Sequence, residues 1–145
     1  MSYTVDTNVL LYASDSASAV HRQAAALLRR ISEGPELVYL FWPVVTGYLR
    51  MATHPAIFAA PLTIDTAMAN IAALIERPHV RTPGETEAFW RVLAEVAADA
   101  QPAGNLVPDA HLVALMREHG VRTIWSRNRD LRRFSGIEVR DPFAE

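Results

Sequence analysis

The sequence predicts an α/β fold with a mainly parallel central sheet. Short apolar or β-branched segments alternate along the chain with longer stretches of helical periodicity. One apolar segment, residues 37–41, is almost continuously hydrophobic, which is typical of a strand covered on both faces. The chain has 145 residues, half of them hydrophobic, which is enough for one domain with its own core. We therefore expect a single domain over residues 1–145.

The first half of the chain should begin with a buried strand at residues 3–6, followed by a polar turn. A loop at residues 15–18 is expected to cap the next helix, which Gly34-Pro35 should end. The other elements follow from apolar spacing and flanking prolines: a helix over 21–31, a strand over 37–41, a helix over 42–52, and a helix capped by Thr63 or Asp65 that runs to 76.

The second half of the chain continues this alternation. Gly120 is expected to end a helix in the left-handed conformation that glycine adopts easily. The expected elements are a strand over 79–82, helices over 85–99 and 108–119, a strand over 122–126 and a further short strand over 137–139. The sheet should therefore have four or five strands.

Composition narrows the classes of function. The net charge of −2 and a pI near 6.2 do not fit a general nucleic-acid binder, so any contact with phosphate must be local. All basic residues are arginine, which makes bidentate contacts to phosphate that lysine cannot make. The absence of cysteine excludes disulfides and thiolate metal sites and leaves carboxylates as the expected ligands. Neither a signal peptide nor an apolar run of about 20 residues is present, so we expect a cytoplasmic protein without membrane segments.

Three isolated acids lie beside hydrophobic elements: Asp6, Asp109 and Asp130. A carboxylate in such a place is costly to desolvate unless a cation or a hydrogen-bond donor meets it. Asp6 and Asp130 follow strands, and ligands of parallel sheets gather at the carboxyl ends of the strands. Asp109 follows Pro108 in the first turn of a helix, where its charge faces the positive helix end. We expect these acids to converge on Mg²⁺ or Mn²⁺, with a metal-bound water as the nucleophile toward a phosphodiester.

Each acid also has a purely structural explanation. Asp6 could cap the turn after the first strand, Asp109 could be a favourable first-turn acid, and Asp130 could be a helix N-cap. Taken singly, the structural explanation is the better one for Asp109 and Asp130, and it is about even for Asp6. The three acids together, each at the start or end of an element, favour a site.

The chain resembles the PIN-domain ribonucleases, specifically the VapC toxins of bacterial toxin–antitoxin pairs. The segments that carry the resemblance are VDTNVLLYA at 5–13, GNLVPDAHL at 104–112, the strand and polar turn at 124–134, and WPVVTGYLR at 42–50 followed by THP at 53–55, which is similar to a subgroup abundant in mycobacteria. The resemblance covers nearly the whole chain. It implies a PIN-like three-layer α/β/α sandwich and metal-dependent cleavage of RNA.

Two positions depart from the family pattern. Most PIN domains have a glutamate near the position of Gly47, and the first acid of their last motif is here Asn128. The resemblance therefore implies a four-acid cluster reduced to three carboxylates that act as catalytic residues and metal ligands: Asp6, Asp109 and Asp130. Fewer carboxylates should weaken metal binding. Glu118 is a candidate substitute for a missing acid, although an exposed ion pair with Arg117 or Arg122 explains it more simply.

Other polar residues are expected to support the site. Asn8, Asn128 and Ser126 could coordinate through an oxygen or orient a metal-bound water. The densest basic run could steer an RNA backbone, although it could also be an ordinary solvated turn: Arg127, Arg129, Arg132 and Arg133.

The resemblance implies a toxin whose partner is a VapB-like antitoxin, and a homodimer formed through helices. A second hypothesis is an inactive PIN fold that binds RNA or an antitoxin, and Gly47 and Asn128 are the features that favour it. A phospho-accepting receiver domain would need a lysine, which this chain lacks. A small phosphatase has no supporting motif.

Overall fold

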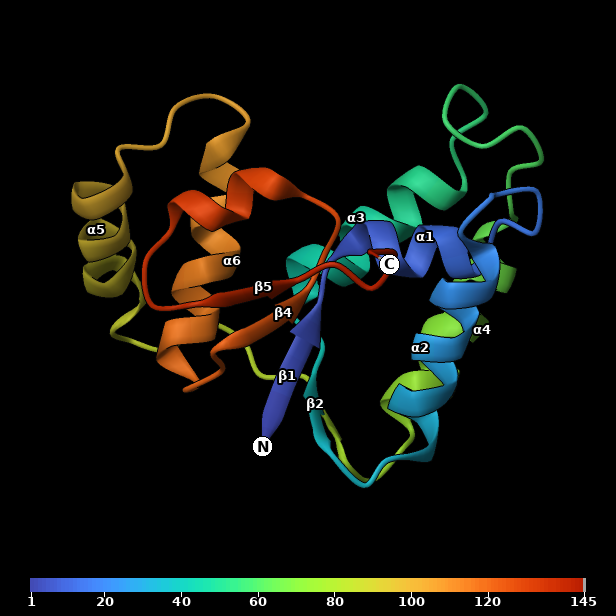
Figure 1. The fold of residues 1–145 in the computed structure, drawn as a ribbon, viewed down its shortest axis with the longest axis horizontal. Helices are drawn as coiled ribbons and strands as arrows, with labels where there is room; N and C mark the ends of the chain where they lie inside the picture. The colour runs from blue at the N-terminus through green and yellow to red at the C-terminus, as the bar shows by residue number, and fades with distance from the viewer. Residues whose placement is uncertain (145) are drawn as a thin grey trace.

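The computed structural model describes residues 1–144, which form one parallel sheet with helices on both faces (Figure 1). The strands are β1 (Ser2–Val5), β2 (Leu37–Tyr39), β3 (Val80–Arg81), β4 (Thr123–Trp125) and β5 (Glu138–Arg140). The helices are α1 (Thr7–Ala13), α2 (His21–Glu33), α3 (Trp42–Ala52), α4 (Ile64–Ile75), α5 (Phe89–Ala100), α6 (Leu106–Glu118) and the short 3₁₀ helix η1 (Arg129–Arg133).

The strands are arranged in the order β3-β2-β1-β4-β5, and every neighbouring pair is parallel. β1 is central, with Thr4 opposite Tyr39 of β2 on one side and opposite Ile124 of β4 on the other. Because sequential strands build outward from β1 in both directions, the sheet has a switch point between β1 and β4. Ligands of open α/β sheets bind at such a point, outside the carboxyl ends of the strands.

The helices divide between the two faces of the sheet. α1, α2, α3 and α4 pack together on one side, and α5 and α6 pack together on the other, with η1 beside α6 (Figure 1). This division follows from the right-handed crossover rule, because the chain reverses direction across the sheet after β3. The three-layer α/β/α arrangement and the parallel sheet predicted from the sequence are both confirmed.

The core lies between these layers. Val5, Val38 and Ile124, one from each central strand, are completely buried. Leu115 and Met116 of α6 are also fully buried against the sheet. Strands buried on both faces explain why their sequences are almost continuously apolar.

Most predicted elements occur within a few residues of their expected positions. Thr63 caps α4, since its hydroxyl accepts a hydrogen bond from Thr66 N at 3.1 Å. Gly120 has a φ of 69° after α6, and Val121 N donates to Met116 O at 2.9 Å, which is a Schellman termination. The predicted helical end at Gly34 is likewise confirmed.

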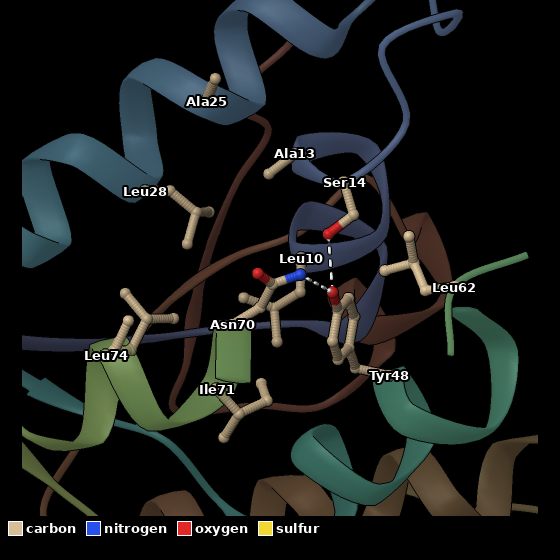
Figure 2. Close-up of a pocket in the computed structure, with 11 residues that line it drawn as sticks. Leu10, Ala13, Ser14, Ala25, Leu28, Tyr48, Leu62, Asn70, Ile71 and Leu74 are labelled. Atoms are coloured by element: carbon tan, nitrogen blue, oxygen red, sulfur yellow. Dashed lines mark hydrogen bonds between the residues drawn. The ribbon is translucent and has the colours of Figure 1, made fainter. Parts of the chain in front are cut away.

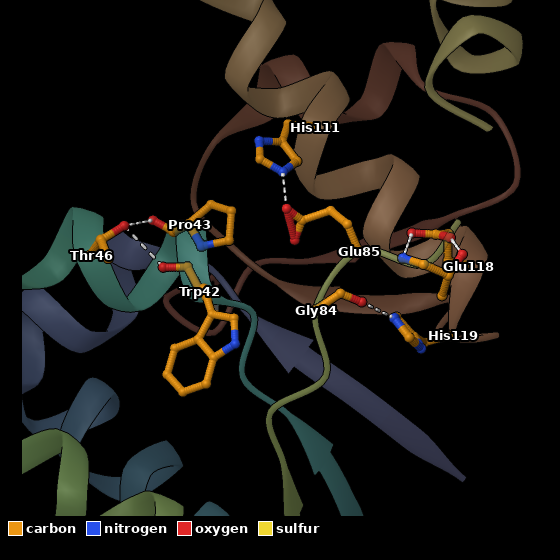
Figure 3. Close-up of polar contacts among 9 residues, drawn as sticks. Trp42, Pro43, Thr46, Gly84, Glu85, His111, Glu118 and His119 are labelled. Carbon is orange, nitrogen blue, oxygen red and sulfur yellow. Dashed lines mark hydrogen bonds and ion pairs between the residues drawn. The ribbon is translucent and has the colours of Figure 1, made fainter. Parts of the chain in front are cut away.

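Three details of the prediction are wrong. The polar turn expected after the first strand is the helix α1. The loop at 15–18 provides no side-chain cap for α2, whose N-cap is Val20. α5 begins at Phe89 rather than at residue 85, because the preceding segment makes tertiary contacts: Thr86 donates its backbone N–H and its hydroxyl to the Glu118 carboxylate of α6 (Figure 3).

A buried tyrosine ties the helices of one face together. The Tyr48 hydroxyl on α3 is 2.7 Å from Ser14 Oγ and accepts a hydrogen bond from Asn70 Nδ2 of α4 at 3.0 Å (Figure 2). These residues line a cavity of about 310 Å³ with apolar side chains of α1, α2 and α4. Tyr48 is 1% exposed, and these partners satisfy the hydrogen-bonding capacity of its buried hydroxyl. Among residues 1–144, the helices are all too short or too polar to span a bilayer.

Truncating the core at β4 should destabilise the fold strongly. Ile124→Ala removes a fully buried side chain from the strand next to β1, and we expect it to lower the free energy of unfolding by about 2–5 kcal/mol. The matched control is Ile64→Ala, because Ile64 is 54% exposed and its truncation should cost less than about 0.5 kcal/mol. Chemical denaturation of both variants checks this, and equal costs would contradict the assignment of β4 to the core.

Candidate active site

The switch point between β1 and β4 brings two polar segments together. Asp6 directly follows β1, and Ser126 directly follows β4. The parallel ladder continues to the start of the site, since Asp6 N donates to Trp125 O at 3.0 Å. Two side chains far apart in the sequence are therefore placed at one edge of the sheet by main-chain pairing.

Both carboxylate oxygens of Asp6 are held by hydrogen bonds. Oδ1 accepts from Thr7 N at 2.7 Å, and Oδ2 accepts from Ser126 Oγ at 2.8 Å. Asp6 is thus the N-cap of α1, so the capping role considered for it is real. Capping involves only one oxygen, whereas the bond to Ser126 fixes the second oxygen across 120 positions of sequence.

Ser126 is the hub of this cluster and is 1% exposed. Its hydroxyl donates to Asp6 and accepts from Asn128 N at 2.9 Å and, more weakly, from Asn8 Nδ2 at 3.4 Å. Asn8 Oδ1 in turn accepts from Arg127 N at 3.4 Å. The three predicted supporting residues therefore meet around the first acid, where they fix the turn after β4.

Asp109 joins the same cluster from α6. It lies in the first turn of the helix, which begins at Leu106, two residues before the predicted start. Asn128 Nδ2 lies 3.4 Å from both Asp109 carboxylate oxygens. A chain of contacts thus runs from Asp6 through Ser126 and Asn128 to Asp109.

Burial raises the pKa of the Asp109 carboxyl above its usual range. The hydrogen bond from Asn128 opposes this, while the negative charges of Asp6 and Asp130 raise the pKa further. None of the three carboxylates forms an ion pair with an arginine or histidine of residues 1–144. The site therefore concentrates negative charge that the described side chains do not neutralise, which is the environment that a divalent cation stabilises.

Asp6 and Asp109 line an open pocket of about 510 Å³. Its other walls come from α1, α3 and α6, and its lining residues are Thr7, Pro43, Val44, Thr46, Gly47, Arg50, Met51, Pro108 and Leu112. Gly47 lies on the α3 wall and has no side chain, so this position provides no carboxylate. A Cβ at that position would lie 3.1 Å from Thr7 Oγ1, so the threonine would have to shift by a few tenths of an ångström.

Asp130 is placed differently from the other two acids. It is exposed in η1 and does not line the pocket, although its charge acts on Asp109. The N-cap of η1 is Asn128, whose Oδ1 accepts from Asp130 N at 3.0 Å, so the N-cap role considered for Asp130 is wrong. Across residues 1–144, no three histidine, aspartate or glutamate side chains come together in a metal-binding arrangement. The three-carboxylate metal site stays a prediction.

The predicted arginine run lies beside this edge and outside the pocket. All four side chains are exposed. The Arg127 guanidinium lies over the rings of Phe143 and Tyr12, at 5.6 Å and 6.0 Å from their centroids. Arg133 donates to Ala100 O at 3.4 Å. Arg129 and Arg132 form no side-chain hydrogen bond or ion pair with residues 1–144, so their guanidinium groups are available to solvent.

Glu118 does not belong to the site, and neither suggested ion pair forms. It accepts hydrogen bonds from Thr86, at 3.2 Å from the backbone nitrogen (Figure 3). His111, two residues after Asp109, is turned toward Glu85, with 3.7 Å between Nε2 and the carboxylate.

Sequence reasoning missed Thr7 and Arg50 as pocket residues. Arg50 has a recognisable signal, because it follows Gly47 by three positions and so shares its helix face.

The PIN-domain family matches residues 3–137. The chain belongs to the PIN-domain family. Ribonuclease VapC48 of Mycobacterium tuberculosis (strain H37Rv) is 54% identical over 144 residues, which cover 99% of each chain. The resemblance to PIN-domain VapC proteins of a mycobacterial type is therefore confirmed.

Solved structures share the fold at low sequence identity. VapC20 of M. tuberculosis, described as a sarcin-ricin loop cleaving toxin, has a TM-score of 0.66 and 20% identity, and the match covers 96% of this chain and 99% of that one. VapBC2 of Rickettsia felis, described as bound to a DNA fragment from its promoter, has a TM-score of 0.68 and 11% identity over 96% of this chain and 97% of that one. These matches confirm the PIN-like sandwich.

Removing the charge of Asp109 should stabilise the metal-free protein. The folded-state pKa is raised, so the charged carboxylate disfavours folding above that pKa, and protonation at lower pH removes the penalty. We expect Asp109→Asn to raise the melting temperature by about 2 °C at pH 7 in EDTA, and the gain to shrink toward pH 4.

The matched control for this melt is Asp65→Asn, since Asp65 is an exposed first-turn acid of α4. Removing its charge also removes the favourable interaction of the carboxylate with the positive N-terminal end of α4. The melting temperature should therefore stay equal or fall slightly. A loss of stability in Asp109→Asn as well would contradict the charge-repulsion argument.

Proposed function

We propose that this protein is a metal-dependent endoribonuclease that acts as the toxin of a type II toxin–antitoxin pair. The observation that carries the proposal is the 54% identity, over 99% of both chains, to a protein named as a ribonuclease. The site supports it, because two carboxylates line an open pocket at the switch point of the sheet, where α/β folds bind their ligands.

The donor set fits Mg²⁺ or Mn²⁺. Only oxygen ligands are offered, and the carboxylates lack cationic partners among residues 1–144. Asp6 and Asp109 would hold the ion, and Asp130 would contribute from outside the pocket, directly or through water, as hydrated Mg²⁺ allows. When bound, such an ion supplies an activated water and stabilises charge on the phosphate.

The residues of this chain would prepare the pocket for that chemistry. Ser126 holds Asp6 Oδ2 with a bond of 2.8 Å, which fixes the direction of the free lone pairs of the carboxylate. Asn128 keeps Asp109 in contact with the same turn. Partners that orient metal ligands in this way are important for affinity. Arg129 and Arg132, exposed beside the site, would attract the RNA backbone.

The proposed partners follow the relatives. A VapB-like antitoxin would bind the toxin and block its acidic pocket, and RNA would be the substrate. The similar structure of VapBC2 is described as a complex bound to promoter DNA, which supports a toxin–antitoxin pairing for this fold. We also propose a cytoplasmic location and a homodimer formed through helices.

One observation favours a second function, an inactive PIN fold that binds RNA or an antitoxin. Among residues 1–144, two carboxylates line the pocket, and Gly47 and Asn128 occupy positions where most of the family has acids. Titration with Mg²⁺ and Mn²⁺ in an RNA cleavage assay separates the two functions. Absence of cleavage with either metal, after verified removal of antitoxin, would favour the binding function.

Asp6→Asn is the sharpest test of the metal site. It keeps the size of the side chain and leaves an oxygen to accept from Thr7 N, but removes the charge of one of the two carboxylates that line the pocket. We expect loss of the melting shift produced by Mn²⁺, RNA cleavage lower by at least about 100-fold, and no growth arrest on induction. The folded state should persist, as measured by a cooperative melt in EDTA. A variant that arrests growth like the parent, with the same Mn²⁺ shift, would refute a metal role for Asp6.

Ser126→Ala tests the hub while leaving both acids in place. It removes the hydroxyl that donates to Asp6 and accepts from Asn128 N, so Asp6 should lose its fixed orientation. We expect cleavage to fall about 10–100-fold with the Mn²⁺ midpoint shifted to higher concentration. Ser135→Ala is the control, because Ser135 is an exposed serine whose hydroxyl bonds to Asp99 away from the pocket. Equal activity of the two variants would show that Asp6 needs no support from Ser126.

A further inference from the structure

Arg50 is the one positively charged side chain among the described residues that line the pocket of Asp6 and Asp109. It projects from the last turn of α3, one helical turn after Gly47. Its side chain is exposed and forms no ion pair or hydrogen bond with residues 1–144. An unpaired guanidinium in the same pocket as two uncompensated carboxylates is therefore available to a ligand.

The other donors of the α3 wall are already engaged. Thr46 Oγ1 donates back into its own helix, to Trp42 O at 3.0 Å and Pro43 O at 3.4 Å (Figure 3). Next to this wall, Thr7 Oγ1 of α1 donates to Val44 O at 3.3 Å. The remaining lining residues of α3 are apolar or, at Gly47, have no side chain. Arg50 is thus the only strong donor that this wall offers.

The pocket is consequently divided by charge. Carboxylates come from the β1–α1 junction and from α6, and the guanidinium comes from α3. A phosphodiester carries its charge on two non-bridging oxygens. One oxygen can face the carboxylate side through a cation, while the other can be met by the planar donors of an arginine.

We propose that Arg50 binds a backbone phosphate of single-stranded RNA in this pocket and so positions the strand against Asp6 and Asp109. This inference rests on the proposed function and deepens it, because it assigns the substrate contact on the wall where most PIN domains have a glutamate. Arg50 acts in substrate binding, and its removal affects KM and RNA affinity more than kcat.

The test measures RNA binding separately from cleavage. Antitoxin-free protein is titrated against a fluorescently labelled single-stranded oligoribonucleotide of mixed sequence in EDTA, and anisotropy gives Kd over a range of salt concentrations. Arg50→Gln should raise Kd about tenfold, as expected for loss of a charge-assisted hydrogen bond. The slope of log K against log salt should fall by about 0.7, because one phosphate contact is lost.

Two variants make the measurement specific. Arg29→Gln removes an equally exposed, unpaired helical arginine from α2, outside the pocket, and should change Kd less than about twofold. Arg50→Lys keeps the charge but not the planar donor pair, so it should retain the salt slope and recover only part of the affinity. In Mn²⁺, Arg50→Gln should raise KM for RNA cleavage with a smaller change in kcat.

The outcomes distinguish this inference from the proposed function. If the parent binds RNA through Arg50 but never cleaves it, the enzyme assignment fails and the inference holds. If Arg50→Gln matches Arg29→Gln in Kd and salt slope, the inference is overturned whether or not the parent cleaves RNA. Loss of antitoxin affinity with unchanged RNA binding would also overturn it, in favour of a protein ligand. An absence of RNA binding by the parent would overturn it directly.

Discussion

The parallel pairing of β1 with β4 is the constraint on which the rest of the site depends. It places Asp6 and Ser126 side by side although 120 positions separate them, and their 2.8 Å hydrogen bond extends the pairing from main chain to side chain. The chain then leaves β1 toward one face of the sheet and β4 toward the other (Figure 1). The pocket forms on the β1 side of this point, where the β1–α1 junction supplies Asp6, α6 supplies Asp109 and α3 forms the remaining wall.

The alternation of strands and helices was predictable because each element buries apolar side chains. The spacing of those side chains in the sequence indicates directly whether the element is a strand or a helix. The missed helix α1 is short, and its first residues, Thr7 and Asn8, are polar ones that also favour turns. The late start of α5 involves a contact that is distant in sequence, besides the local hydrogen bond from Ala88 N to Thr86 Oγ1. Thr86 is held by Glu118 of a distant helix, so a segment with helical periodicity stays non-helical.

The site was predictable where it follows from sheet topology and unpredictable where it depends on a turn. Asp6 and the segment that contains Asn128 both follow strands, so their placement at the same edge of the sheet could be inferred from the parallel order alone. The direction of Asp130 is set by η1, in which Asn128 takes the capping position and turns the acid outward. Arg50 was assigned no role from the sequence although it follows Gly47 by three positions, and its place next to the acids becomes evident only because α3 and α6 line one pocket.

The start of the chain and Phe143, near its other end, lie at different distances from the edge of the sheet that carries Asp6. β1 starts at Ser2 and reaches the site only at Asp6, so Ser2 lies about 13 Å from the site along the strand and Met1 lies beyond it (Figure 1). Phe143, by contrast, packs against Arg127 and Tyr12 at the edge where Asp6 and Ser126 lie. An affinity tag or fluorescent fusion joined ahead of Met1 therefore begins away from that edge and leaves it clear for a macromolecule to approach.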